Sequence, residues 1–206
     1  MPNTMVSTTV FLKSMAKRLH RWLLLLVFMP FLAWTAEIDI TSPQISATDD
    51  GYALSADFNF ELNQRLEEAV TKGLMLYFVA DFELSKERWY WLDEKLMSRS
   101  QTYRLSYHAL TRQYRLSIGS GLHQSFSSLP EAMAVLTRLR HWQVADKSDK
   151  GIRIGEPVQA ALRFRLDVAQ LPKPFQITSL GNKDWSLSSD WKIWQVTLPA
   201  IAVENK

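Results

Sequence analysis

Cysteine is absent from the 206-residue sequence, and glycine and proline are scarce, at 7 and 8 residues. The lack of cysteine excludes disulfide scaffolds, thiolate metal sites, iron–sulfur clusters and cysteine nucleophiles. The low glycine and proline content, with 47% hydrophobic and 22% charged residues, excludes disordered, collagen-like and low-complexity chains. The length fits one globular domain with a short appendage.

Acidic residues are missing from the first 36 positions, whose only charges are Lys13, Lys17, Arg18 and Arg21. The whole chain carries 24 basic and 21 acidic residues, a net charge of +3. Without the four N-terminal charges, 20 basic residues face 21 acidic ones, which gives the body a net charge of −1. A near-neutral body lacks the basic surface on which nucleic-acid binding depends, so we predict no nucleic-acid partner.

The N-terminal region has the pattern of a secretory signal peptide. A basic stretch at 17–21 precedes an apolar run of 13 residues at 22–34, which is shorter than the ~18 residues of a spanning helix. Cleavage after Ala36 would release a body that begins at Glu37, although bulky Trp34 stands where signal peptidase prefers a small residue. We therefore expect residues 15–36 to be a signal peptide that delivers the body to the periplasm.

Two further expectations concern processing. The alternative to cleavage is an uncleaved anchor, in which residues 22–34 contact the inner membrane and the body faces the periplasm. Residues 1–14 add nothing that a signal needs, because Met15 begins a normal signal peptide by itself. We expect residues 1–14 to be an extension that precedes the true start at Met15, and residues 37–206 to be a single exported β-rich domain.

From residue 37 onward, the dominant period of the apolar residues is two, which is typical of half-buried strands. The alternation is clearest over 52–60, where Asp49-Asp50-Gly51 supplies a hairpin turn, and over 158–168. The similar segments 103–106 and 114–117 predict a second hairpin that turns at 110–112. In all, strands are predicted at 45–48, 52–60, 74–84, 88–94, 103–106, 114–117, 158–168 and 191–198.

Two helices are predicted between these strands. The first covers 64–72, with Asn63 as its N-cap and Gly73 after its end. The second covers 129–141, where Ser128 and Glu131 have the spacing of a capping box and the basic residues Arg138, Arg140 and His141 lie at the carbonyl end. About eight strands with two short helices in their connections predict a mainly β fold. We expect an antiparallel β-sandwich, with an immunoglobulin-like arrangement as one form of it.

Three segments resemble a known family. Residues 88–94 (RWYWLDE), 105–117 (LSYHALTRQYRLS) and 166–176, followed by Asp184-Trp185 and Trp191, are similar to the family called domain of unknown function 4390. That family comprises exported proteins of Gram-negative bacteria. The resemblance covers nearly the whole body and implies a signal peptide and one exported domain. It implies no activity, so it assigns no functional residue.

Signatures of catalysis and of metal binding are missing from the sequence. His108, His123 and His141 have no helical i, i+4 partner, and a metal site would need distant residues to converge. No nucleophile elbow, P-loop or dinucleotide-binding fingerprint occurs. We predict no catalytic residue, no metal and no cofactor, and we expect binding rather than enzymatic activity.

Two groups of residues are candidate binding surfaces. The aromatic residues Trp89, Tyr90 and Trp91 either fill the core or form a groove for a peptide or glycan. Four arginines lie opposite the apolar faces of their strands, and they form either a solvated sheet face or a patch for lipid headgroups. That patch requires all four strands to share one sheet. The arginines are Arg104, Arg115, Arg163 and Arg165, of which Arg163 and Arg165 are taken with Trp89, Tyr90 and Trp91 as the candidate binding residues.

These features predict a non-enzymatic protein-binding or adaptor module of the cell envelope, with another envelope protein as its partner. The alternative is an envelope enzyme or carrier that acts on a glycan or lipid. An open cavity between the sheets would favour the carrier, whereas a filled core with an exposed sheet edge would favour protein binding.

Overall fold

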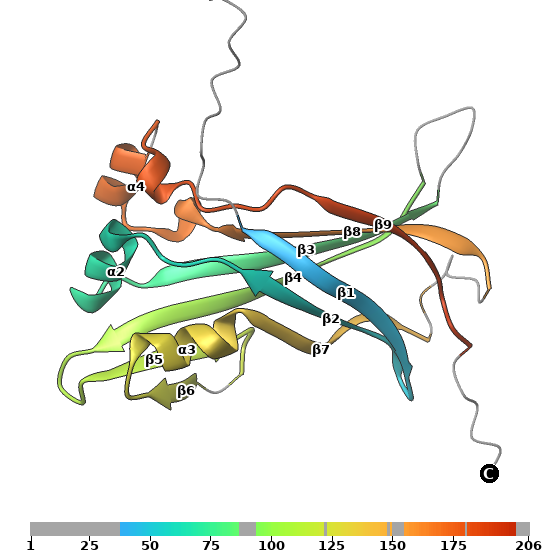
Figure 1. The fold of residues 1–206 in the computed structure, drawn as a ribbon, viewed down its shortest axis with the longest axis horizontal. Coiled ribbons are helices and arrows are strands. Elements are labelled where there is room, and N and C mark those ends of the chain that lie inside the picture. Colours follow the sequence, from blue (N-terminus) through green and yellow to red (C-terminus); the bar gives the residue numbers. More distant parts are fainter. Residues whose placement is uncertain are drawn as a thin grey trace, which may run out of the picture. The chain divides into compact units, whose positions relative to one another are not determined.

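The computed structural model describes residues 38–86, 94–121, 123–147, 149, 155–179 and 181–200. Their strands form two antiparallel sheets, one with the order β1-β2-β7 and one with the order β6-β5-β4-β3-β8-β9 (Figure 1). The predicted mainly β, antiparallel fold is therefore confirmed. The strands are β1 (Asp39–Thr48), β2 (Gly51–Asn59), β3 (Leu76–Lys86), β4 (Glu94–His108), β5 (Gln113–Ile118), β6 (His123–Phe126), β7 (Arg138–Asp146), β8 (Pro157–Leu166) and β9 (Lys192–Thr197).

The connections in the described ranges contain three α-helices and two short 3-10 helices. These are α2 (Gln64–Thr71), α3 (Leu129–Leu136), α4 (Lys173–Ser179), η1 (Val168–Gln170) and η2 (Lys183–Trp185). None of them is long and apolar enough to cross a membrane.

The two sheets pack face to face, and the hydrophobic core lies between them. Phe58 of β2 stacks on Phe164 of β8 with 4.2 Å between ring centroids, and Phe82 of β3 meets Trp142 of β7 edge-on at 6.4 Å. Most of the residues that the alternation predicts to point inward are buried, although Phe60 and Val168 at the ends of their segments are only half-buried. The buried residues include Phe58, Leu105, Leu116, Leu162 and Phe164. The period-two pattern thus identified the buried side of four strands.

Both predicted hairpins are present. Thr48 pairs with Gly51 across the β1–β2 turn, and Leu105 pairs with Leu116 between β4 and β5. Gly51 adopts φ +151°, and a Cβ at this position would lie 2.0 Å from the carbonyl oxygen of Ala145. Only glycine allows β2 to approach β7 so closely at the start of the strand.

The first predicted helix is confirmed as α2. Its N-cap Asn63 accepts a hydrogen bond from the amide of Leu66 at 3.0 Å, and Gly73 follows its end with φ +92°. Leu66 and Val70 are buried, so the helix closes one end of the core with one apolar face.

The second predicted helix is correct only at its start. Ser128 caps α3 as expected, but the helix ends at Leu136, and the basic residues Arg138, Arg140 and His141 belong to strand β7. Pairing with β2 decides this outcome, because Leu139 lies opposite Ala56 and is buried against the core. Tertiary pairing here overrides the helical pattern.

Five elements were not predicted from the sequence: β6, β7, α4 and the two 3-10 helices η1 and η2, of which η1 begins at Val168, where the alternation predicted strand. The prolines at 172 and 174 lie outside any strand, as expected, but β8 already ends at Leu166, before η1, and the chain forms α4 after Pro172, with Pro174 in its first turn. The predicted strand at 88–94 lies outside the described residues except for Glu94, which begins β4.

Candidate functional site

All four candidate arginines lie on the six-stranded sheet. Arg104 is on β4, Arg115 on β5, and Arg163 and Arg165 on β8, each alternating with buried residues. Their side chains therefore project from the face of the sheet opposite the core. The condition that the sequence left open, a single sheet for both strand pairs, is met.

Arg163 and Arg165 converge on Asp81 of β3. Arg163 Nη2 and Arg165 Nε each lie 3.0 Å from Asp81 Oδ2, and Ser100 donates to Oδ1 at 2.8 Å. Arg165 also approaches Asp167 at 3.6 Å. Burial raises the pKa of Asp81, but the hydrogen bonds from Ser100, Arg163 and Arg165 outweigh it and hold the pKa below its ordinary value.

This network gives Arg163 and Arg165 a structural role. Asp81 and Asp167 balance their two charges, and the Arg163 guanidinium lies 4.6 Å from the ring centroid of Trp191. The network ties β3, β4 and β8 together across the outer face. A role for these two arginines in binding stays a prediction.

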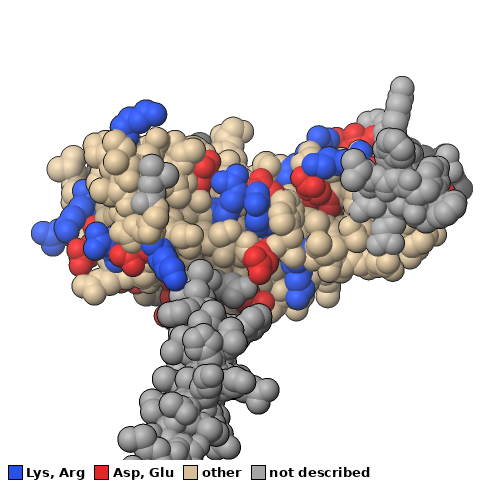
Figure 2. Space-filling model, turned by 90° about the horizontal axis from the view of Figure 1, so that it is seen from above, with Lys and Arg blue, Asp and Glu red and all other residues tan. Residues whose placement is uncertain are grey.

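Arg104 and Arg115 differ from the β8 pair. Within the described part of the chain, neither has a carboxylate within ion-pair distance, and Arg104 donates to Ser117 Oγ at 3.4 Å. Figure 2 looks onto the side of the molecule where β9 and α4 lie uppermost in Figure 1. Among the described residues that Figure 2 draws in colour, basic and acidic side chains intermix, and they form no patch of one sign on that side.

The aromatic candidates Trp89, Tyr90 and Trp91 lie outside the described residues. Other tryptophans pack into the fold: Trp185 is buried against Phe175, and Trp194 contacts Phe82 with 6.5 Å between centroids. Trp185 and Phe175 also line a hollow of about 430 Å³ beside α2.

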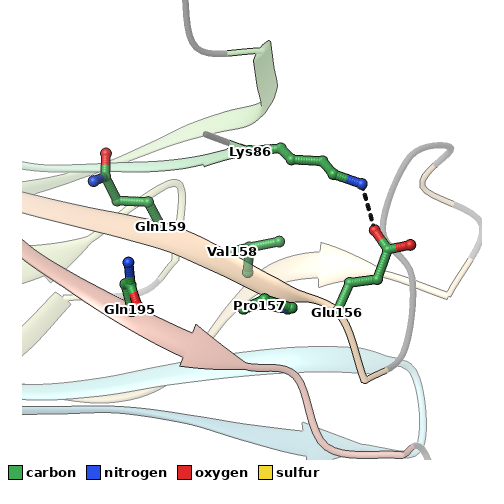
Figure 3. A pocket seen from close by; sticks show the side chains of 6 residues that line it. All are labelled: Lys86, Glu156, Pro157, Val158, Gln159 and Gln195. Atoms are coloured by element: carbon green, nitrogen blue, oxygen red, sulfur yellow. Dashed lines mark hydrogen bonds and ion pairs between the residues drawn. The ribbon is translucent and has the colours of Figure 1, made fainter. Parts of the chain in front are cut away.

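A hollow of about 310 Å³ lies at the end of β8 and β9 (Figure 3). Lys86 reaches across it to Glu156, with 2.6 Å between Nζ and Oε2. Its remaining lining consists of two apolar and two amide side chains, so it can hold a side chain but presents no nucleophile. Those residues are Pro157, Val158, Gln159 and Gln195. No group of three or more histidine, aspartate and glutamate side chains within the described ranges could hold a metal ion.

Strand β9 forms one edge of the six-stranded sheet, and its backbone orientation follows from β8. The segment that leads into β9 already pairs with the end of β8. Leu166 donates its amide to the carbonyl of Leu187, and the amide of Ser189 donates to the carbonyl of Phe164, both at 2.8 Å. The even-numbered residues of β8 therefore direct their backbone groups toward the β9 side. In an antiparallel strand, the N–H and C=O of one residue point to the same side. The backbone groups of every second residue of β9 therefore point toward β8, and those of the residues between them point away from it.

The register then identifies which residues face outward. Trp194 pairs with Ala160 and Val196 pairs with Val158 without any register shift, so their amides and carbonyls face β8. The amides and carbonyls of Ile193, Gln195 and Thr197 consequently point away from the sheet. No described strand lies on that side. The sequence predicted the strand at 191–198, but strand order is a tertiary property that a local pattern does not encode.

The fold defines an antiparallel β-sandwich with aromatic rings packed between its sheets and with β9 at one edge of the larger sheet. A family model described as "Domain of unknown function (DUF4390)" matches residues 35–195, and the chain belongs to this family. The family resemblance of the three segments is thereby confirmed. Searches of curated proteins and of solved structures returned no match.

Proposed function

We propose that this protein is an exported, non-enzymatic module of the cell envelope that binds another envelope protein. Export rests on the basic stretch at 17–21 and the apolar run at 22–34. The observation that carries the binding role is the combination of a filled interior with an open sheet edge.

The filled centre is an aromatic cluster around Phe164. This ring lies within 6 Å, centroid to centroid, of four other rings, two from the small sheet side and two from the large sheet. A carrier needs internal space for its lipid or glycan, and these rings occupy the described centre of the sandwich. The partners of Phe164 are Phe58, Phe60, Phe78 and Tyr103.

Export is tested with a reporter that works only outside the cytoplasm. A fusion of residues 15–40 should give signal, and the matched fusion carrying Leu24→Arg should not, because a charge interrupts the apolar run. A silent wild-type fusion would contradict export. N-terminal sequencing of the mature protein should begin at Glu37, whereas an intact Met15 in the inner-membrane fraction would establish the anchored form.

Binding is tested by capture from the envelope fraction of the same organism. The tagged full chain should retain a discrete partner at near-stoichiometric yield after washing. A control chain with Phe164→Ala, whose core is disrupted, should lose that partner. Retention of nothing but proteins that the control also retains would contradict the binding role.

A further inference from the structure

Four strands lie at sheet edges among the described residues: β1 and β7 in the small sheet, and β6 and β9 in the large one. Natural proteins protect such edges from pairing with other chains by bulges, prolines, charges or short length. The four edges of this sandwich differ in how much of this protection they carry.

Three of the edges are protected. In β1 the register with β2 shifts between Thr41 and Gln44, where Ser42 has φ +49° and Pro43 follows. In β7 the register shifts twice, and His141 has φ +47°. β6 has only four residues. Each of these features interrupts the regular row of donors and acceptors that an incoming strand needs.

β9 carries none of these interruptions. Its six residues, KIWQVT, pair with β8 in unbroken register and include no proline, no bulge and a single charge at Lys192. Isoleucine, tryptophan, valine and threonine favour extended structure. The edge therefore presents three outward amides and three outward carbonyls in a regular row, those of Ile193, Gln195 and Thr197.

We propose that an extended segment of the partner protein adds to the sheet along β9. This inference rests on the proposed function and identifies the surface through which it acts. The outward amides and carbonyls of β9 would pair with the backbone of the incoming segment, which would become a seventh strand.

The side chains along β9 specify the segment. On the core side, half-buried Trp194 and Val196 favour apolar residues at alternate positions of the partner. On the outer side, Ile193 is 56% exposed, and Gln195 lines the hollow of about 310 Å³, which has room for one side chain of the added strand. No carboxylate of the described residues lies within ion-pair distance of Lys192, which is exposed. An acidic residue of the partner could therefore pair with Lys192 at that end of the strand.

The charge of Lys192 favours a different protein over a second copy of this chain. Residues 191–203 contain no aspartate or glutamate. Two copies paired antiparallel through β9 would therefore bring no carboxylate from this segment to either Lys192. A partner segment that supplies the missing charge satisfies the edge more completely.

The test is photo-crosslinking in cells that express the full chain. A photoreactive amino acid at Ile193 should give one adduct with another protein, and the same amino acid at Leu110, 93% exposed in the β4–β5 turn, should not. Gln195→Pro removes one outward amide without removing a bond to β8 and should lower the adduct yield about tenfold or more. Gln195→Thr loses the same side chain but keeps the amide, and should stay within about twofold of the parent.

The outcomes separate this inference from the proposed function. If Gln195→Pro does not fold, Thr197→Pro serves instead. The amide of Thr197 also points outward, and Thr197 is the last residue of β9, so a proline there disturbs the strand least. Persistence of the adduct in the folded proline variant, the same adduct from Leu110, or an adduct with a second copy of this chain would each overturn the inference. A captured partner that never crosslinks at Ile193 would overturn the edge and leave the proposed function intact. No captured partner at all would overturn both.

Discussion

The interior of the sandwich and the β9 edge differ in what they leave unsatisfied. In the interior, Phe164 is fully buried and meets four aromatic rings, so its own surroundings are filled by side chains. Along the edge, Ile193, Gln195 and Thr197 direct their backbone groups away from the sheet. The comparison teaches that the centre of this molecule is closed by side-chain packing, whereas backbone groups that could pair with another chain lie at its rim.

The largest expected effect breaks the interior. Phe164→Ala removes the ring at the centre of the aromatic cluster and should lower the free energy of unfolding by about 3–5 kcal/mol, because the surrounding rings cannot close the cavity fully. Urea unfolding followed by tryptophan fluorescence measures this loss. A change below about 1 kcal/mol would mean that the interior is not tightly filled.

A smaller loss of stability is expected from the ion-pair network on the outer face of the six-stranded sheet. Asp81→Asn removes the carboxylate shared by Arg163 and Arg165 and should cost about 1–2 kcal/mol at neutral pH, less than a fully buried ion pair because the arginines are partly solvated. Urea unfolding at pH 7 measures it, with Glu83→Gln as a control at the more exposed pair with Lys95.

The same carboxylate predicts a pH dependence. Its pKa in the folded state lies below the ordinary value of 3.8, so its contribution is fully present above that value and is lost as the pH falls through the folded pKa. The stability of the parent should therefore fall more steeply than that of Asp81→Asn below about pH 4. Parallel slopes for the two proteins would contradict the depressed pKa.

The smallest effect is expected at the edge. Gln195→Thr replaces an exposed side chain in β9 and should change the free energy of unfolding by less than about 0.5 kcal/mol. Thermal unfolding of Gln195→Thr, Phe164→Ala and the parent under the same conditions compares the two losses of stability directly. A loss comparable with that of Phe164→Ala would show that the β9 edge is part of the structural core.

The sequence predicted the parts of this fold whose causes are local. Alternation located the buried faces of β2 and β8, and the cap at Asn63 located α2, because side-chain period and capping depend on neighbouring residues. The segment at 138–141 was wrongly predicted as helix, because its strand structure depends on pairing with β2, far away in the sequence.

The candidate site was less accessible from the sequence for the same reason. Arg163 and Arg165 were identified as outward-facing, but their shared partner Asp81 lies on a strand about 80 residues earlier, and only the register of β3 with β8 joins them. The open edge of β9 depends on strand order, which no local pattern contains. A composition of alternating apolar and polar residues predicts a strand at an edge and at the centre of a sheet alike.

Amide hydrogen exchange along β9 tests the central claim most directly. In the mature chain without a partner, the amides of Trp194 and Val196 should be protected, and those of Ile193, Gln195 and Thr197 should exchange about a hundredfold faster or more. This alternation would show that the edge is open and that odd-numbered residues carry it. Equal protection across residues 193–197 would show that the edge is already paired, and would contradict the account.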